Sequence, residues 1–485
     1  MSRTPRSAIL LVVLIGLAGC TAGVDAPRAD AAAGRTDDTR PMPEIAVGGS
    51  GSSADRIGWE GGYWYNDSIP LNRSDGVSDA ELEAYLARAM ARVEYLRGHE
   101  FSRPIGIEVQ TREALRAKVE RTGSFASNET LSSEKATIMN VFWEAMFFVG
   151  EDRDVRAVRA SEGASFLGAY YVFGSDRIRI VTPADEPPLV DEDLLVHELV
   201  HALQDEYAGT PLETRSDDDS YATAALVEGD AVYVTRRFRD RCAAGWDCVE
   251  VPPRGSGGGA GDVHPGFRTL RRFAYSDGPA FVDTLYTEGT GGVDGWAAVD
   301  AAFENRPRTT EEIIHPGRYP MATPDRPGRA VKPRNGWRHL GGPYTVGEME
   351  IFGLFWYQAV RHDSPVLDPA SYEEPDRGTH DRFNYTAAPS AGWDGDRLDV
   401  FTDGERTGYV WISRWDTERD AVEFADAYRR VLAERGGERL DDGTWVVQDG
   451  PFADAFVVER RGRLVTVVNG PTPMALRDID PRLPG

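Results

Sequence analysis

The sequence predicts an α+β protein, in which a mainly helical domain with a small sheet is followed by a small C-terminal α+β module. Several long segments have apolar residues three and four positions apart, as helices do, whereas shorter segments at residues 167–183 and beyond residue 390 alternate in the manner of strands. The chain has 485 residues, of which 41% are hydrophobic and 10% are aromatic. This is enough material for one large hydrophobic core and a smaller unit.

The N-terminus has the layout of an export signal. Arg3 and Arg6 precede an apolar run over residues 8–18, which is too short to span a membrane as a mature helix, and Leu-Ala-Gly-Cys ends the run at Cys20. Because this ending resembles a lipobox, we expect a lipoprotein signal peptide over residues 1–19. A lipid-modified Cys20 would then anchor the protein at the extracellular face of the cell membrane. An ordinary cleaved signal or an uncleaved anchor is the alternative.

Residues 20–55 are rich in Ala, Gly, Ser and Asp, a composition typical of flexible linkers. We therefore expect a flexible tether between the anchor and a large domain over residues 56–390.

The first part of this domain, up to about residue 160, is predicted to be mainly helical. Residues 78–98 have helical periodicity behind a Ser-Asp cap, and residues 136–150 are densely apolar. Residues 167–183 then predict two strands joined at a Gly-Ser-Asp turn. This hairpin is expected either to form the rim of a cleft, where an extended peptide can pair with it, or only to pack on the following helix.

A metal-binding pattern lies in the helical segment over residues 191–207, which reads DEDLLVHELVHALQDEY. His197 and His201 are one turn apart on the same helix face, so both imidazoles can reach one metal ion, while Glu198 points at the metal's open position. Asp191 is a suitable N-cap residue, which places the motif in mid-helix. This layout is that of the ligands in a zinc hydrolase, with one Zn²⁺ per chain.

Burial argues for Glu228 as the third metal ligand. The segment over residues 221–234 is small and apolar except at Glu228 and Asp230. A lone carboxylate in a packed helix is costly, and a metal ion removes that cost. Twenty-six residues separate His201 from Glu228, so the Asp-rich connection must loop out. The alternative is that Glu228 pairs with one of the many arginines.

Two further carboxylates are candidates for acceptors that orient the imidazoles behind the metal. Asp205 lies one turn beyond His201, and Asp230 follows Glu228 closely. The alternative for each is an ordinary solvated carboxylate.

Helical patterns return between residues 265 and 390 and enclose the segment TTEEIIHPGRYP over residues 309–320. His315 and Tyr319 lie at its Pro/Gly break, from which side chains can project toward a cleft. A zinc hydrolase gains from a Tyr or His donor that stabilises the developing oxyanion, so both are candidate catalytic residues. A purely structural hydrogen bond is the alternative for His315.

Residues 391–485 are predicted to form the separate C-terminal module. Strand-like segments surround one amphipathic helix over residues 417–436. The module has no cluster of catalytic residue types, and the chain contains no phosphate-binding Gly loop, Gly-x-Ser-x-Gly elbow or zinc-ribbon Cys set.

The chain is strongly acidic, with 79 Asp and Glu against 54 Lys and Arg and a net charge of −25. Lysine is almost absent, occurring only at Lys118, Lys135 and Lys332. This balance argues against nucleic acid as a partner. It favours instead a surface adapted to very high salt, where screening removes the repulsion between carboxylates.

Cys242 and Cys248 are the cysteines other than Cys20. In an oxidising compartment outside the cell they could close a small disulfide loop.

Several of these segments together resemble a family of gluzincin-like zinc metallopeptidases on archaeal and bacterial surfaces, especially surface lipoproteins from high-salt organisms. The resemblance covers about residues 165–470 and rests on GAYYVFGSDRIRIV, HELVHALQDEY, ALVEGDA, LRRFAYSDGPAFVDTLY, TTEEIIHPGRY and VWISRWDTERDAVEFADAYRR. It implies a zincin-like metallopeptidase domain over residues 56–390. The ligands it implies fall on His197, His201 and Glu228, the base on Glu198, and its His-Pro-x-x-Tyr segment on His315 and Tyr319, while Tyr207 stands where Phe is expected.

The expected function is that of a cell-surface zinc metallopeptidase, which hydrolyses peptide bonds of a peptide or protein substrate through a metal-activated water. The main alternative is a catalytically inactive surface lipoprotein, in which zinc only braces two helices. Glu198 separates the two, because a structural site has no need of a carboxylate between the ligands. Hydrolysis of a bond other than a peptide bond is a third candidate.

Overall fold

The computed structural model has the mixed α+β architecture that the sequence predicts. It describes residues 46–47, 56–69, 71, 78–122, 132–159, 168–182, 191–209, 214, 216–249, 264–321, 327–329, 331–373 and 380–483. The predicted signal peptide over residues 1–19, Cys20 and nearly all of the predicted tether lie outside the described residues. Within the tether, however, Ala46–Val47 form strand β1, which pairs with β4.

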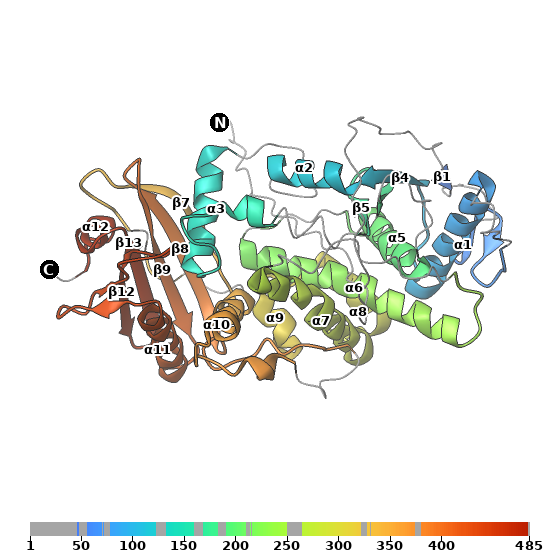
Figure 1. Ribbon diagram of the computed structural model, residues 1–485. Coiled ribbons are helices and arrows are strands. Elements are labelled where there is room, and N and C mark those ends of the chain that lie inside the picture. Colours follow the sequence, from blue (N-terminus) through green and yellow to red (C-terminus); the bar gives the residue numbers. More distant parts are fainter. Residues whose placement is uncertain are drawn as a thin grey trace, which may run out of the picture.

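A four-stranded sheet in the order β1-β4-β6-β5 lies near one end of the molecule (Figure 1). Its other strands are β4 (Ile105–Thr111), β5 (Ala169–Val172) and β6 (Arg177–Thr182). β4 and β6 are parallel, whereas β5 pairs antiparallel with β6 and ends the described sheet. The expected hairpin over residues 167–183 is therefore confirmed. Beside this sheet lie α1 (Asp79–Arg97), α2 (Arg112–Thr122) and the small hairpin of β2 (Trp59–Glu60) and β3 (Tyr63–Trp64).

The prediction of a mainly helical region up to residue 160 was wrong for β4. This strand carries buried Ile105 and Ile107 and pairs along its length with β6. Strand pairing to a segment some seventy residues away outweighs the short local pattern, which lies between the predicted helices.

Helices fill the middle of the molecule, and the longest of them, α6, runs through it with α7, α8 and α9 alongside (Figure 1). Their bounds are α3 (Ser133–Ala145), α5 (Glu192–Tyr207), α6 (Asp217–Ala243), α7 (Pro265–Glu288), α8 (Gly295–Glu304), α9 (Thr310–Ile314) and α10 (Glu348–His362), with short 3-10 turns η1 (Pro316–Arg318) and η2 (Pro369–Tyr372). None of the helices in the described part of the chain is both long and apolar enough to cross a membrane.

An antiparallel seven-stranded sheet forms the other end of the molecule, in the order β10-β11-β12-β13-β9-β8-β7 (Figure 1). Its strands are β7 (Arg338–Tyr344), β8 (Trp393–Thr402), β9 (Thr407–Trp415), β10 (Glu438–Arg439), β11 (Trp445–Val446), β12 (Ala455–Arg461) and β13 (Leu464–Gly470), accompanied by α11 (Glu418–Glu434) and α12 (Pro473–Ile479). The sheet starts before residue 391, the expected start of the module, because β7 pairs with β8.

The hydrophobic core is continuous from the central helices into this sheet. The ring of Phe147, just after α3, lies 5.5 Å from that of Tyr428 on α11 and 5.2 Å from that of Phe452, between their centroids. Close by, a Cβ added to Gly150 would lie 2.3 Å from the carbonyl oxygen of Pro451. The C-terminal sheet is therefore packed tightly onto the helical part.

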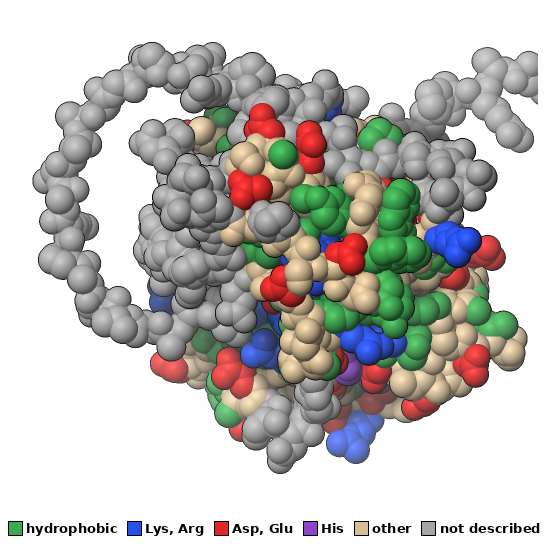
Figure 2. Space-filling model, turned by 90° about the vertical axis from the view of Figure 1, so that its right-hand side faces the viewer, with side chains coloured by type: hydrophobic (Ala, Val, Ile, Leu, Met, Phe, Trp, Pro, Cys, Tyr) green, Lys and Arg blue, Asp and Glu red, His purple; other side chains and the backbone are tan. Residues whose placement is uncertain are grey.

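The surface carries the acidic character of the sequence. Figure 2 views the end of the molecule at which α1 lies, where Asp and Glu side chains are scattered between hydrophobic and polar ones. At an ionic strength of about 0.1 M, salt largely screens the repulsion between those carboxylates that are more than about 10 Å apart.

Candidate metal centre

Helix α5 carries the motif that the sequence singled out. Asp191 caps the helix by accepting a hydrogen bond from the backbone of Asp193 at 3.1 Å. Leu195, Leu199 and Leu203 are fully buried against the four-stranded sheet and α1. Their burial holds the opposite helix face, with His197 and His201, toward α6.

The two imidazoles and the Glu228 carboxylate converge on one point. Nε2 of His197 and Nε2 of His201 are 3.2 Å apart, and Oε2 of Glu228 lies 3.1 Å from the first and 3.4 Å from the second. Zinc bonds of about 2.0–2.1 Å in tetrahedral geometry place ligand atoms roughly 3.3 Å from one another. The three donor atoms therefore fit the spacing of a zinc site without rearrangement.

In the protein alone, His201 and Glu228 have the electrostatics of a buried ion pair. Burial opposes the charged form of His201, but the Glu228 carboxylate outweighs it and raises the pKa of His201 to about 9. Burial also opposes the charge of Glu228, yet His201 and His197 together lower the pKa of this carboxyl to about 2. Glu228 is thus a carboxylate at neutral pH, as a metal ligand must be.

Gln204, one turn beyond His201, determines which nitrogen of His201 faces the metal position. The amide Nε2 of Gln204 donates to the backbone oxygen of Val227 at 2.9 Å and to Oδ2 of Asp230 at 3.0 Å. Both partners are acceptors, so the amide oxygen faces His201, whose Nδ1 donates to it at 2.9 Å. Nε2 of His201 is therefore left unprotonated in the neutral ring and is the atom available to a metal.

Asp230 is the centre of a buried network behind Gln204. It forms an ion pair with Arg97 of α1 at 2.9 Å and accepts a hydrogen bond from the hydroxyl of Tyr207 at 3.1 Å. Asp230 thus acts on His201 through Gln204. The Tyr207 hydroxyl, which the expected Phe lacks, takes part in this network.

Glu198 and Asp205 hold the β5–β6 hairpin against α5. Oε2 of Glu198 accepts a hydrogen bond from the backbone of Tyr171 in β5 at 2.7 Å. Asp205 accepts hydrogen bonds from the Tyr171 hydroxyl at 2.9 Å and the Gly174 backbone at 2.8 Å. Asp205 was predicted to orient an imidazole, but these bonds direct it to the hairpin. Burial raises the pKa of Glu198 and outweighs the lowering effect of the two histidines.

Tyr275 of α7 is a member of the site that the sequence did not indicate. Its ring lies 6.3 Å from the His197 ring, between centroids, at an interplanar angle of 28°. Burial raises the pKa of Tyr275, and the Glu228 carboxylate raises it further through its charge and a side-chain hydrogen bond.

His315 and Tyr319 were predicted to project toward the metal, but the structure places them elsewhere. Nε2 of His315 pairs with Glu348 of α10 at 3.2 Å, and the Tyr319 hydroxyl donates to the backbone of Asn305 at 2.6 Å. Helix α9, which precedes His315, begins at Thr310, and the hydroxyl of Thr310 donates to Asp218 at 2.6 Å. Asp218 precedes Glu228 by ten residues on α6, or roughly 15 Å along the helix.

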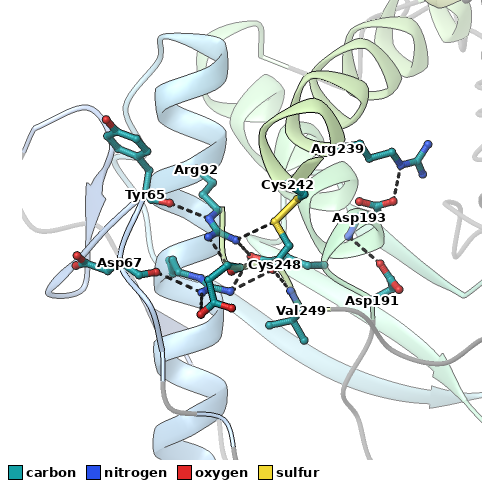
Figure 3. The surroundings of a disulfide bond; sticks show 12 residues. Tyr65, Asp67, Arg92, Asp191, Asp193, Arg239, Cys242, Cys248 and Val249 are labelled. Atoms are coloured by element: carbon teal, nitrogen blue, oxygen red, sulfur yellow. Dashed lines mark hydrogen bonds and ion pairs between the residues drawn. A yellow bond between two sulfur atoms is a disulfide. The ribbon is translucent and has the colours of Figure 1, made fainter. Parts of the chain in front are cut away.

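A disulfide between Cys242, near the end of α6, and Cys248 closes a small loop that contacts the start of α5 (Figure 3). The loop that the disulfide closes ends at Val249, whose backbone N–H donates to Glu192, the first residue of α5, at 2.7 Å.

The buried Glu192 carboxylate also accepts hydrogen bonds from Arg92 at 2.6 Å and Arg88 at 3.1 Å. Both arginines lie on α1, so α1 and the disulfide loop are held to the first residue of α5, the helix that carries the two histidines. The sequence suggested the disulfide but gave no indication of this arginine pair.

Comparison with known proteins gives one match. A family described as a domain of unknown function, DUF8575, matches residues 338–480. This segment runs from β7 to the last helix and so coincides with the C-terminal sheet, whereas the motif of α5 and α6 lies outside it. No curated protein and no solved structure matches the chain.

Proposed function

We propose that this protein is a zinc-dependent metallopeptidase of the cell surface, with a zincin-like catalytic domain over residues 56–390. The observation that carries the proposal is the convergence of His197, His201 and Glu228 with Glu198 next to them in sequence. A carboxylate between the two histidines is placed as the general base of a zinc hydrolase, whereas the binding of a structural zinc ion does not require it.

The three convergent residues would hold the metal through Nε2 of each imidazole and a carboxylate oxygen. Zinc bound there would act as a Lewis acid, lowering the pKa of a coordinated water toward about 7 and polarising the scissile carbonyl.

Glu198 serves as the general base and then as the proton carrier. Its buried position raises the pKa of the carboxyl, which strengthens it as a proton acceptor. The backbone N–H of Tyr171 holds one carboxylate oxygen, which fixes the orientation of the side chain. Glu198 accepts the proton of the attacking water and passes it to the leaving amine.

Strand β5 supplies a docking edge for an extended substrate. β5 is the last strand of the described sheet, and the backbone N–H of its residue Tyr171 donates a hydrogen bond to Glu198. A peptide that adds to this edge by main-chain hydrogen bonds brings its backbone next to the base. We propose peptides or proteins outside the cell as substrates, with a lipid anchor at Cys20.

A second candidate is an inactive surface protein in which zinc braces α5 against α6. Burial favours it, since the residues His197, Glu198, His201 and Glu228 are only 2%, 3%, 2% and 2% exposed. Structural zinc sites are closed in this manner, whereas catalytic sites keep a position open to substrate.

Digestion of a broad peptide library by the full chain in high salt separates the two candidates. We expect cleavage by the wild-type protein and none by Glu198→Gln, with equal zinc content and equal circular dichroism, because the amide cannot accept a proton. Zinc-loaded, folded wild-type protein that cleaves no peptide would reject the peptidase in favour of the structural site.

A further inference from the structure

Helices α6 and α7 meet at a pair of glycines next to the metal centre. A Cβ added to Gly229 of α6 would lie 2.4 Å from the carbonyl carbon of Gly278, and one added to Gly278 of α7 would lie 2.4 Å from the backbone oxygen of Ala225. Both distances are far below van der Waals contact, and both end on backbone atoms that cannot rotate away. The crossing of the two helices at this distance therefore requires glycine at both positions.

This crossing determines what faces Glu228. Gly229 follows Glu228 directly, and Gly278 lies about one turn after Tyr275. The close approach of the two backbones thus brings the Tyr275 side chain to the middle of α6, where Glu228 lies. The Tyr275 ring also lies close to the ligand helix α5, since it is nearly parallel to the His197 ring with 6.3 Å between their centroids.

A hydroxyl donor at this point has a definite use. Both imidazoles approach the same carboxylate oxygen, Oε2 of Glu228, at 3.1 and 3.4 Å. A carboxylate on a free side chain can rotate and exchange its two oxygens. A fixed donor that binds the carboxylate removes this freedom and holds the ligand oxygen toward the histidines.

We propose that Tyr275 is a positioning residue of the metal centre, whose hydroxyl holds the Glu228 carboxylate in the orientation that binds the metal. The inference rests on the proposed function, because it takes Glu228 to be the third zinc ligand. On this proposal, the close crossing of α6 and α7 at Gly229 and Gly278 is what places the Tyr275 hydroxyl next to Glu228.

Tyr275→Phe tests the proposal, since it keeps the ring and removes the hydroxyl. The matched control is Tyr286→Phe on the same helix, where the ring packs on Trp296 at 4.9 Å between centroids, away from the ligands. Zinc affinity is measured by competition with a chromophoric chelator. The visible spectrum of the cobalt-substituted full chain reports the ligand geometry, and circular dichroism reports the fold.

We expect Tyr275→Phe to bind zinc about 10- to 100-fold more weakly than the wild-type chain and to shift the cobalt spectrum, while Tyr286→Phe changes neither. Unchanged zinc affinity and an unchanged spectrum in folded Tyr275→Phe would overturn the role of Tyr275 and leave the proposed function intact. Unchanged affinity with lost turnover would also overturn it, because the hydroxyl would then act on the reacting atoms. A wild-type chain that binds no zinc would overturn the proposed function itself.

Gly278→Ala provides a second route if Tyr275→Phe does not fold. The added methyl group meets the Ala225 backbone and pushes α7 away from α6 while the Tyr275 hydroxyl is retained. The same loss of zinc affinity is expected. A folded Gly278→Ala chain with wild-type affinity and cobalt spectrum counts against the proposal.

Discussion

The side-chain oxygen of Gln204 accepts a hydrogen bond from Nδ1 of His201 over 2.9 Å, within the same turn of α5. Gln204 is fully buried, and its amide continues to Asp230 and, through it, to Arg97 of α1. A proposed metal ligand on one helix is therefore oriented by a chain of polar contacts that reaches two other helices.

Replacing Gln204 by Leu should weaken zinc binding by about 10- to 100-fold, because the imidazole of His201 loses the partner that fixes its tautomer. Stability should also fall by about 1–3 kcal/mol, since Asp230 loses a buried donor. Gln358→Leu is the control, since Gln358 of α10 is similarly buried but donates to the backbone oxygen of Phe147, just after α3. It should lower stability alone. Equal zinc affinity in both variants would remove the orienting role of Gln204.

Removing the metal should lower the melting temperature of the wild-type chain, because a ligand at about a thousand times its dissociation constant stabilises the fold by about 4 kcal/mol. Glu228→Gln should melt at the same temperature with and without chelator, since it lacks the third ligand. Glu198→Gln is the matched control and should respond to chelator as the wild type does. Metal analysis that finds Glu228→Gln fully loaded would exclude Glu228 as a ligand.

His315→Ala should cost stability and spare catalysis. The hydrogen bond to Glu348 is the main cause that raises the pKa of His315, with Glu311 adding to it and burial and Arg318 opposing it. A raised folded pKa means that the stabilisation is fully present below the unfolded pKa of about 6.5 and is lost as pH rises through the folded value.

The measurement is the free energy of urea unfolding at two pH values. The wild type should exceed His315→Ala by about 1–3 kcal/mol near pH 6 and by less near pH 9, at equal turnover per bound zinc. A large drop in turnover with no change in stability would restore His315 to the catalytic site.

Lowering the salt concentration should destabilise the chain. The chain has a net charge of −25, and the repulsion between its carboxylates opposes folding unless salt screens it. The screening length grows from about 3 Å at 1 M salt to about 10 Å at 0.1 M salt. We expect the melting temperature, followed by circular dichroism, to fall steadily across this range. A constant melting temperature would contradict an adaptation to high salt.

The sequence predicted those parts of the site whose signals are local. The spacing of His197 and His201 is a property of one helix turn, and the burial of Glu228 follows from its apolar neighbours. Gln204 and Tyr275 were missed because their roles depend on contacts between helices, and Tyr275 lies 47 residues beyond Glu228 in the chain. Gly229 and Gly278 were the visible traces of the crossing between α6 and α7.

Two of the strands that were not predicted, β4 and β7, were missed for related reasons. β4 has the alternation Ile105, Ile107, Val109, but it is short and lies between long helices. β7 contains the sequence Gly-Gly-Pro over residues 341–343, which indicates a turn, and it pairs with β8 only through irregular register. His315 and Tyr319 show the opposite error, in which a Pro/Gly break suggested exposure but nearby groups satisfy both side chains.

The packing of Phe147 against Phe452 and Tyr428 joins the central helices and the C-terminal sheet in one hydrophobic core. A fragment that ends before residue 338 would carry the metal motif but would lack Tyr428 and Phe452 and so expose the ring of Phe147 to water. Removal of the C-terminal segment would thus lower the solubility of the remaining chain, although the residues of the proposed metal site would be retained. The C-terminal sheet thus shares its hydrophobic core with the helical part of the protein and is not packed as an independent unit.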